Sequence, residues 1–201
     1  MILHEILETE NNKTYQNLSI DNLERQYDFL RSLVNAAMDL ERPMISTSVT
    51  LALNFHAIAC LHVNAGQFRP CPVTVGSYTP PPEYRVPELM NNFVNEVNRF
   101  WEHADAIALG SYVLWRLNHI HPFINGNGRT ARALCYYVIC LKSGGWLSGS
   151  TILPELIRRD RDQYVRLLQD ADQKFRQGQP NFLQDLYDFL RLLVDEQIQT
   201  A

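Results

Sequence analysis

Apolar residues recur at intervals of three and four through most of this 201-residue chain, and this spacing limits the fold more than any other feature. The first such run includes Leu23, Tyr27, Leu30 and Val34, and it ends before Pro43. Later runs cover residues 47–64, 87–101, 104–120, 130–143, 153–175 and 181–198. We therefore expect a mainly α protein of about seven helices.

A proline-rich stretch between residues 67 and 87 interrupts this pattern. It holds six prolines and one alternating fragment, Val73-Thr74-Val75. Prolines stop a helix from continuing, whereas alternation is typical of a strand. We expect a short β-hairpin flap here, on an otherwise helical protein.

Composition predicts the domain organisation and argues against several classes of protein. The polar residues 1–15 are expected to form a flexible N-terminal segment, and residues 16–201 a single helical domain. No apolar run reaches the roughly 20 residues of a membrane span, and the acidic N-terminus is unlike a signal peptide. Four cysteines without paired spacing favour a reducing, cytoplasmic location. A net charge of −4 argues against nucleic-acid binding.

The stretch HPFINGNGRTAR, residues 121–132, gathers reactive and anion-binding groups directly before a helical run. Gly126 and Gly128 flank Asn127, so successive backbone N–H groups can turn inward around an anion at the start of the helix. Arg129 and Arg132 are three residues apart on one helix face, where each guanidinium can hold one phosphate. These residues could instead only cap and solvate the helix, but the combination favours a polyphosphate site.

His121 precedes the glycine loop by five residues, and Pro122 keeps it out of the preceding helix. A neutral histidine beside bound phosphates can take the proton of a hydroxyl that attacks phosphorus. The alternative is a core histidine that is bonded to a carbonyl. His119 is expected to be structural, because no cysteine or further histidine completes a zinc site with it.

The same stretch resembles the signature of the Fic family, H-P-F-x-(D/E)-G-N-G-R-x-x-R, and it matches every fixed position except the fifth. The resemblance extends from about Arg69 to Asp172. It implies a Fic-fold helical domain and a protein adenylyltransferase, which transfers AMP from ATP to a Ser, Thr or Tyr hydroxyl of a target protein. ATP would be the substrate, with Mg²⁺ or Mn²⁺ as the cofactor.

The resemblance also implies roles for single residues. The general base would be His121, the anion hole Gly126, Asn127 and Gly128, the β-phosphate ligand Arg129, and the γ-phosphate ligand Arg132. Tyr164 and Asp172 resemble an adenine-pocket tyrosine and a later polar residue, although a tyrosine at helical spacing is more often part of a core. The flap residues Val73, Thr74 and Val75 would hold an extended segment of the target protein by strand pairing.

The fifth position of the signature holds Asn125, where the family has an acidic ligand of Mg²⁺. An amide oxygen can coordinate Mg²⁺ but adds no negative charge. We therefore expect weaker metal binding and slower transfer, or a requirement for more metal. The asparagine is either native or an engineered change.

A second departure from the family concerns regulation. Many members carry an inhibitory helix, (S/T)-x-x-x-E-(G/N), whose glutamate pairs with the second arginine of the signature. Glu10-Asn11 supplies the end of this pattern, but Ile6 occupies its first position, so there is no match. Arg132 would then be free, and the chain would be either constitutively competent or inhibited by a separate antitoxin-like partner.

Two other functions stay open. The same fold could transfer another group, such as phosphate, UMP or phosphocholine. Alternatively, the chain could be a non-catalytic nucleotide- or peptide-binding module in which Asn125 has abolished turnover. The aromatic and leucine positions of residues 182–194 indicate either core packing or a homodimer interface.

Overall fold

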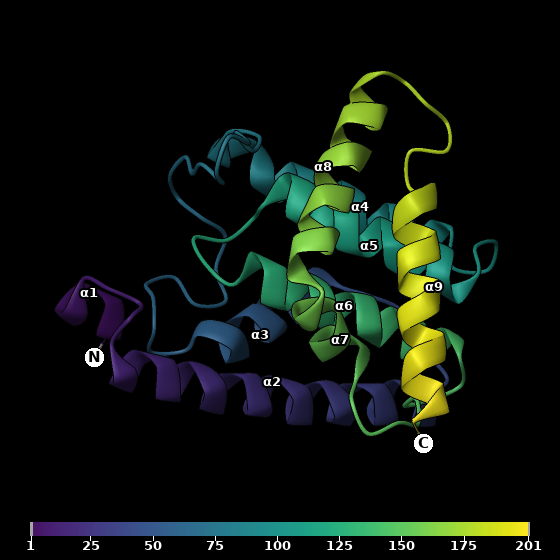
Figure 1. The fold of residues 1–201 in the computed structure, drawn as a ribbon, viewed down its shortest axis with the longest axis horizontal. Coiled ribbons are helices and arrows are strands. Elements are labelled where there is room, and N and C mark those ends of the chain that lie inside the picture. Colours follow the sequence, from purple (N-terminus) through teal and green to yellow (C-terminus); the bar gives the residue numbers. More distant parts are fainter. Residues whose placement is uncertain (1, 201) are drawn as a thin grey trace.

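The protein is described by a computed structural model that covers residues 2–200. Within this range the chain is mainly α-helical, as the sequence predicts (Figure 1). The helices are α1 (Leu3–Leu7), α2 (Lys13–Asp39), α3 (Thr47–Ile58), α4 (Val86–Arg99), α5 (Ala106–Ile120), α6 (Asn127–Lys142), α7 (Leu153–Arg159), α8 (Arg161–Arg176) and α9 (Gln184–Gln199), with a 3₁₀ turn at Glu83–Arg85 before α4.

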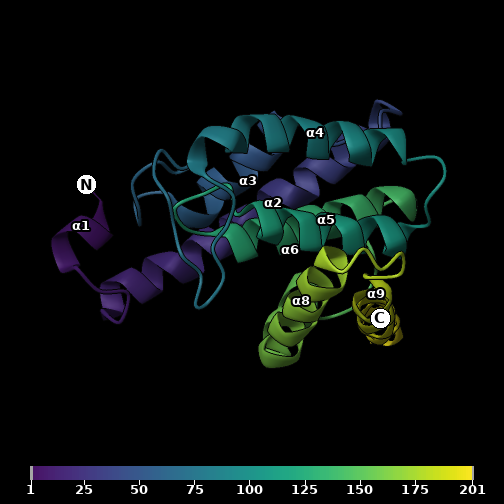
Figure 2. The same ribbon diagram turned by 90° about the horizontal axis from the view of Figure 1, so that it is seen from above.

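Helices α5 and α6 pack against each other at the centre of the molecule. Figure 2 shows them between α2, α3 and α4 on one side and α8 and α9 on the other. Every residue of α6 from Ala133 to Leu141 is buried, which is the pattern of a helix enclosed on all sides. The two helices approach closely because Gly110 of α5 has no side chain: a Cβ there would lie 2.9 Å from the Ile139 side chain.

The first residues do not lie apart from the domain. The sequence analysis expected residues 1–15 to be flexible, but residues 3–7 form α1, and α2 already begins at Lys13. The backbone N–H groups of Leu3 and His4 donate to the carbonyls of Cys60 and Leu61 at 2.9 and 3.0 Å. Leu3 is also buried against Ile58 and Leu61, so both backbone and apolar contacts dock this segment onto the residues that follow α3.

Two helix boundaries also differ from the expectation. Helix α3 ends at Ile58 rather than near residue 64, because the next backbone carbonyls serve other elements: Asn22 of α2 donates to Ala59, and α1 donates to Cys60. The run 153–175 was expected to be one helix. It is split at Asp160, whose φ of −96° and ψ of 33° are not helical, into α7 and α8.

The proline-rich flap is an extended loop with one isolated bridge, rather than the expected β-hairpin. The bridge joins Val75 and Tyr78, whose backbone N–H groups each donate to the other's carbonyl at 2.9 Å. Prolines at 70, 72 and 80–82 lack the N–H groups that a longer ladder would need. The Tyr78 hydroxyl donates to the His119 carbonyl at 2.7 Å, and this bond holds the flap against the end of α5.

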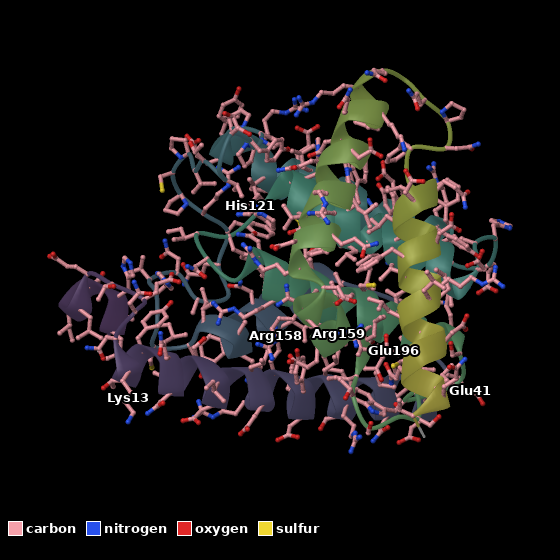
Figure 3. All side chains as sticks on the ribbon, in the orientation of Figure 1. Lys13, Glu41, His121, Arg158, Arg159 and Glu196 are labelled. Atoms are coloured by element: carbon pink, nitrogen blue, oxygen red, sulfur yellow. The ribbon has the colours of Figure 1, made fainter. Side chains whose placement is uncertain are left out.

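No helix in residues 2–200 combines the length and the apolar character that crossing a membrane would require. Ion pairs between side chains join neighbouring helices at the surface. Arg159 of α7 contacts Glu196 of α9 at 2.5 Å, which links the last helix to α7 (Figure 3).

Candidate active site at the start of α6

His121 lies at the C-terminal end of α5 (Figure 3). Its φ of 52° and ψ of 59° are left-handed, and its backbone N–H donates to the Leu117 carbonyl at 2.9 Å, so the residue itself ends the helix. Its ring Nδ1 lies 3.4 Å from the Asn118 carbonyl. A proton on Nδ1 satisfies that carbonyl and leaves the lone pair of Nε2 available to a ligand.

Burial lowers the pKa of His121 to about 4, and the positive charge of Arg69 acts in the same direction, whereas the hydrogen bond to the Asn118 carbonyl opposes both. The imidazole is therefore neutral near pH 7, as a general base must be before it accepts a proton.

Arg69 is a residue that the sequence analysis noted only as the start of the family resemblance. It is 2 % exposed, and its guanidinium donates to the carbonyls of His121, Cys71 and Pro81. Its backbone N–H also donates to the Pro122 carbonyl at 2.8 Å. One buried cation thus ties the flap to the loop that carries His121. The only sequence signal was an arginine in a proline-rich, otherwise weakly charged stretch.

The loop after His121 is held closed by Asn127, the first residue of α6. Its side-chain oxygen accepts from the Phe123 N–H at 3.0 Å, and its side-chain nitrogen donates to the Phe123 carbonyl at 2.9 Å. Phe123 itself is fully buried. Gly126 has a φ of 78°, and a Cβ there would lie 2.7 Å from Cγ2 of Ile58, so only glycine fits.

Asn54 of α3 fixes the same loop from the other side and was not singled out from the sequence. Its amide nitrogen lies 3.0 Å from the Asn125 carbonyl and 3.2 Å from the Thr130 hydroxyl, while its oxygen accepts from the Gly66 N–H at 3.0 Å. Asn54 is completely buried. An asparagine on the inward face of an apolar helix is the only sequence signal for this role.

A pocket opens beside the loop, between α5, the start of α6, α8 and the flap. Six of the predicted site residues line it: Val75, His121, Gly128, Arg132, Tyr164 and Asp172. The other predicted site residues, Val73, Thr74, Asn125, Gly126, Asn127 and Arg129, are not among its lining residues.

The two arginines of the motif point to different surroundings. Arg132 lines the pocket, and its Nε is buried without a hydrogen-bond partner in residues 2–200, which suits an anion. Arg129 instead donates to the Ala57 carbonyl at 2.8 Å, to the Ser19 hydroxyl at 3.1 Å and to Oδ1 of Asn125 at 3.1 Å. In this structure Arg129 holds the motif against α2 and α3.

Tyr164 and Asp172 form the far wall of the pocket. Tyr164 is 4 % exposed, and its hydroxyl accepts from the Asn118 amide at 2.8 Å. Oδ1 of Asp172 accepts from the Trp115 indole N–H at 2.9 Å and lies 2.7 Å from Nδ1 of His119. His119 therefore has a side-chain partner in Asp172, and it also lines the pocket.

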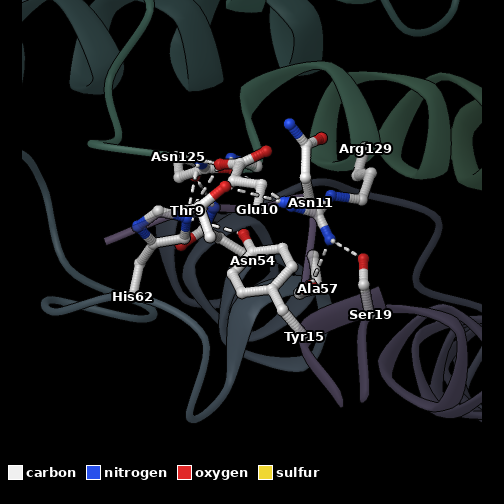
Figure 4. A network of polar contacts seen from close by, with 11 residues as sticks. Thr9, Glu10, Asn11, Tyr15, Ser19, Asn54, Ala57, His62, Asn125 and Arg129 are labelled. Atoms are coloured by element: carbon white, nitrogen blue, oxygen red, sulfur yellow. Dashed lines mark hydrogen bonds and ion pairs between the residues drawn. The ribbon is translucent and has the colours of Figure 1, made fainter. Parts of the chain in front are cut away.

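The N-terminal segment contacts the motif loop at Asn125, the residue at the expected metal position (Figure 4). Nδ2 of Asn125 lies 3.0 Å from Oε1 of Glu10 and 2.9 Å from Nε2 of His62. Oδ1 of Asn125 accepts from the Gly126 N–H at 2.6 Å and from Arg129. The sequence analysis did not assign Glu10 or His62 to the site.

The donor set allows a divalent cation only together with bound phosphates. No group of three or more histidine, cysteine, aspartate or glutamate side chains in residues 2–200 could enclose a metal ion. Mg²⁺ usually takes one or two carboxylates and fills the rest of its shell with phosphate oxygens and water. Glu10 places one carboxylate beside Asn125 but outside the lining of the pocket, so a cation at the nucleotide would be held mainly by phosphate oxygens and water.

Comparison with known proteins matches residues 46–139 to the model of the Fic/DOC family. The protein adenylyltransferase Fic of Drosophila persimilis is 30% identical over 149 residues, which cover 67% of this chain and 28% of that protein. This chain therefore spans little more than a quarter of that relative's length.

Solved structures show the same fold over nearly the whole chain. A Fic domain containing signaling protein from Bacteroides thetaiotaomicron superposes with a TM-score of 0.72 at 21% identity, covering 98% of this chain and 75% of that one. Fic-1 from C. elegans superposes with a TM-score of 0.68 at 24% identity, covering 98% of this chain and 53% of that one.

Proposed function

The chain belongs to the Fic/DOC family, and from this premise we propose that it transfers AMP from ATP to a Ser, Thr or Tyr hydroxyl of a target protein. The observation that carries the proposal is the pocket at the start of α6. It brings together a neutral histidine, a buried arginine nitrogen that no group in the described part of the chain pairs with, and the positive end of a helix. These are the groups that a hydroxyl attack on a nucleotide phosphate requires.

In the proposed reaction Nε2 of His121 accepts the proton of the target hydroxyl as its oxygen attacks the α-phosphorus. The new bond joins that oxygen to the α-phosphorus, and the bond between the α- and β-phosphates breaks, so pyrophosphate leaves with the electron pair. The backbone N–H groups at the start of α6 and the Arg132 guanidinium hold the phosphate oxygens. A bound Mg²⁺ or Mn²⁺ would neutralise part of the phosphate charge.

The remaining walls of the pocket suit the other two substrates. Val165 and Leu168 offer apolar surface to a base beside Tyr164, and Asp172 lies at the same wall. Val75 lines the opposite side, where the flap leaves its side chain 41 % exposed. We assign this exposed edge of Val73, Thr74 and Val75 to the target segment, which would lie extended across the pocket.

Labelled nucleotide tests this proposal directly. The purified chain is incubated with Mn²⁺ and a protein lysate, once with α-labelled and once with γ-labelled ATP. We expect label on protein only from α-labelled ATP. We expect His121→Ala to abolish it, and the matched control His103→Ala, an exposed histidine outside the pocket, to leave it unchanged.

Each contrary outcome points elsewhere. Label from γ-labelled ATP alone would assign phosphate transfer instead. Equal labelling by the His121→Ala variant would remove the proposed base. ATP binding in a calorimeter without any labelling of protein would identify a binding module.

A further inference from the structure

A groove of about 590 Å³ adjoins the pocket that holds His121. It is formed by residues 77–82 of the flap, the 3₁₀ turn before α4 and the ends of α5 and α8. Tyr78 and His119 line both the groove and the pocket, so the two hollows are continuous. None of the motif residues 121–132 lines the groove, which is therefore separate from the expected phosphate site.

Hydrogen bonds within the fold hold the walls of this groove in place. The Tyr78 hydroxyl donates to the His119 carbonyl at 2.7 Å, and the Tyr78 backbone pairs with that of Val75. Further along the flap, the buried guanidinium of Arg69 donates to the Pro81 carbonyl. The proline ring also fixes the local backbone angle φ. The groove is therefore formed before any ligand binds, and a ligand that fits it loses little free energy in ordering the protein.

The groove carries positive charge. Arg85 of the 3₁₀ turn and Arg176 at the end of α8 both line it, and both are exposed to solvent. Among residues 2–200 no aspartate or glutamate lines it, and Glu83 of the same turn is not part of its wall. The whole chain has a net charge of −4, so a hollow with two arginines and no acid is a local exception that favours a negatively charged ligand.

The fold itself does not use these two charges. Within residues 2–200 neither side chain forms an ion pair, whereas Arg159 and Lys174 each contact a carboxylate of α9. The guanidinium carbon of Arg176 lies 5.9 Å from the centre of the Tyr78 ring, and this contact keeps the charge at the groove wall. Asp172 lines an adjoining hollow, but its Oδ1 already contacts two side chains of α5.

Resting on the AMP-transfer function proposed above, we propose that the groove takes an aspartate or glutamate side chain of the target segment, close in sequence to the modified hydroxyl. A carboxylate matches the planar fork of a guanidinium and can accept two hydrogen bonds from it. A segment that crosses the pocket and continues past Tyr78 enters the groove directly, because the two hollows are continuous. An extended chain advances about 3.3 Å per residue, so the acid lies within a few residues of the acceptor. Arg85 and Arg176 then determine specificity and take no part in the transfer step.

The other anion at this site is the nucleotide. Its phosphates are assigned to Gly128 and Arg132, which line the pocket and not the groove. Removing the charges of Arg85 and Arg176 should therefore weaken the binding of an acidic peptide and leave the affinity for ATP unchanged. A groove that held phosphate would show the opposite result.

Fluorescence polarisation with short synthetic peptides tests the proposal. Each peptide carries an uncharged dye and a central threonine in a scaffold of valine and alanine, with glutamate, glutamine or lysine placed at successive positions on either side. The full chain is used without ATP, so that binding is measured apart from transfer. We expect the best glutamate peptide to bind about fivefold or more tightly than its glutamine counterpart, and the lysine peptide to bind more weakly still. Raising NaCl from about 0.05 to about 0.5 M should reduce the difference.

Charge variants locate the preference. Arg85→Gln/Arg176→Gln should abolish the preference for glutamate, and Arg85→Glu/Arg176→Glu should reverse it in favour of lysine. Both positions are exposed, so we expect the variants to fold, which circular dichroism checks. The matched control Arg166→Gln removes the same charge from an exposed position of α8 that lines neither hollow, and it should change peptide affinity by less than about twofold. Calorimetry should give the same ATP affinity for wild type and Arg85→Gln/Arg176→Gln.

The outcomes separate this inference from the proposed function. Equal affinity for glutamate and lysine peptides overturns it, as does a glutamate preference that persists in Arg85→Gln/Arg176→Gln, or the failure of every peptide to bind. A loss of ATP affinity with an unchanged peptide preference assigns the groove to the nucleotide instead. If the preference depends on both arginines but wild-type protein transfers no AMP, the groove stands as a peptide site and the proposed reaction fails.

Discussion

Substituting Gly126 by alanine tests whether the motif loop requires glycine for two separate physical reasons. Its φ of 78° is left-handed, which costs an L-residue about 1 kcal/mol. The new Cβ would also lie 2.7 Å from Cγ2 of Ile58 and 3.0 Å from Nδ2 of Asn54, both completely buried. Overpacking of this kind costs about 1–3 kcal/mol. We therefore expect Gly126→Ala to lower the free energy of unfolding by about 2–4 kcal/mol.

Gly178 provides the matched control for this prediction. Its φ is 70°, but nothing lies within 4 Å of a Cβ built there, so Gly178→Ala should show the backbone cost of about 1 kcal/mol alone. Urea denaturation followed by circular dichroism measures both variants. With an m value of about 3 kcal/mol/M, the midpoint should fall by about 1 M for Gly126→Ala and by about 0.3 M for Gly178→Ala.

A double-mutant cycle isolates the contact with Ile58. In an Ile58→Ala background the clashing methyl is gone, so the further cost of Gly126→Ala should fall towards that of the Gly178 control. Equal midpoint shifts for Gly126→Ala and Gly178→Ala in the wild-type background would refute the steric reasoning. Full additivity with Ile58→Ala would refute it as well.

Three further predictions concern the residues around the pocket. An NMR titration of the His121 ring should have its midpoint near pH 4, and a midpoint above 6 would contradict the burial argument. Because the ring then stays neutral, the rate of AMP transfer should not fall through protonation of His121 as the pH is lowered from 8 to about 5. Asn54→Ala leaves the Gly66 N–H without its acceptor, so the free energy of unfolding measured by urea denaturation should fall by about 2–3 kcal/mol. A loss below about 0.5 kcal/mol would contradict the role of Asn54 in holding the loop. Asp172→Ala leaves the Trp115 indole N–H and Nδ1 of His119 without their partner at the pocket wall, so calorimetry should show weaker ATP binding together with a lower urea midpoint; unchanged ATP affinity would remove Asp172 from the site.

The sequence predicted the central helices and the start of α6 well, because these depend on local patterns. The apolar spacing of residues 104–120 and 130–143 corresponds to α5 and α6, and the glycines at 126 and 128 start α6 as expected. Gly126 adopts a positive φ of 78°, a conformation that favours glycine. Such features follow from neighbours in the chain and need no knowledge of the tertiary contacts.

Features that depend on distant partners could not be predicted in this way. The α3 helix ends early because α1 and α2 bond to the carbonyls at 59–61, and these partners are 37 or more residues away. The three-residue spacing of Arg129 and Arg132 put them on one face, but contacts with Ser19 and Ala57 turn Arg129 away from the pocket. Arg69 likewise gains its role only when the flap and the His121 loop meet.

The same limit applies to the N-terminal segment and the flap. A polar composition suggested a loose segment, yet Leu3 is buried and Glu10 reaches Asn125. Alternation at Val73-Thr74-Val75 suggested a hairpin, but the flanking prolines limit pairing to Val75 and Tyr78. Short local patterns were outweighed in both cases by backbone chemistry or tertiary contacts.

The most direct measurement for AMP transfer by His121 is mass spectrometry of protein incubated with ATP and Mn²⁺. The account predicts that wild-type protein attaches AMP, seen as a mass increase of AMP less one water, to a Ser, Thr or Tyr side chain of itself or of a lysate protein. It also predicts that His121→Ala attaches none. Phosphate adducts in place of AMP, or AMP adducts that persist at the same level in His121→Ala, would contradict the account.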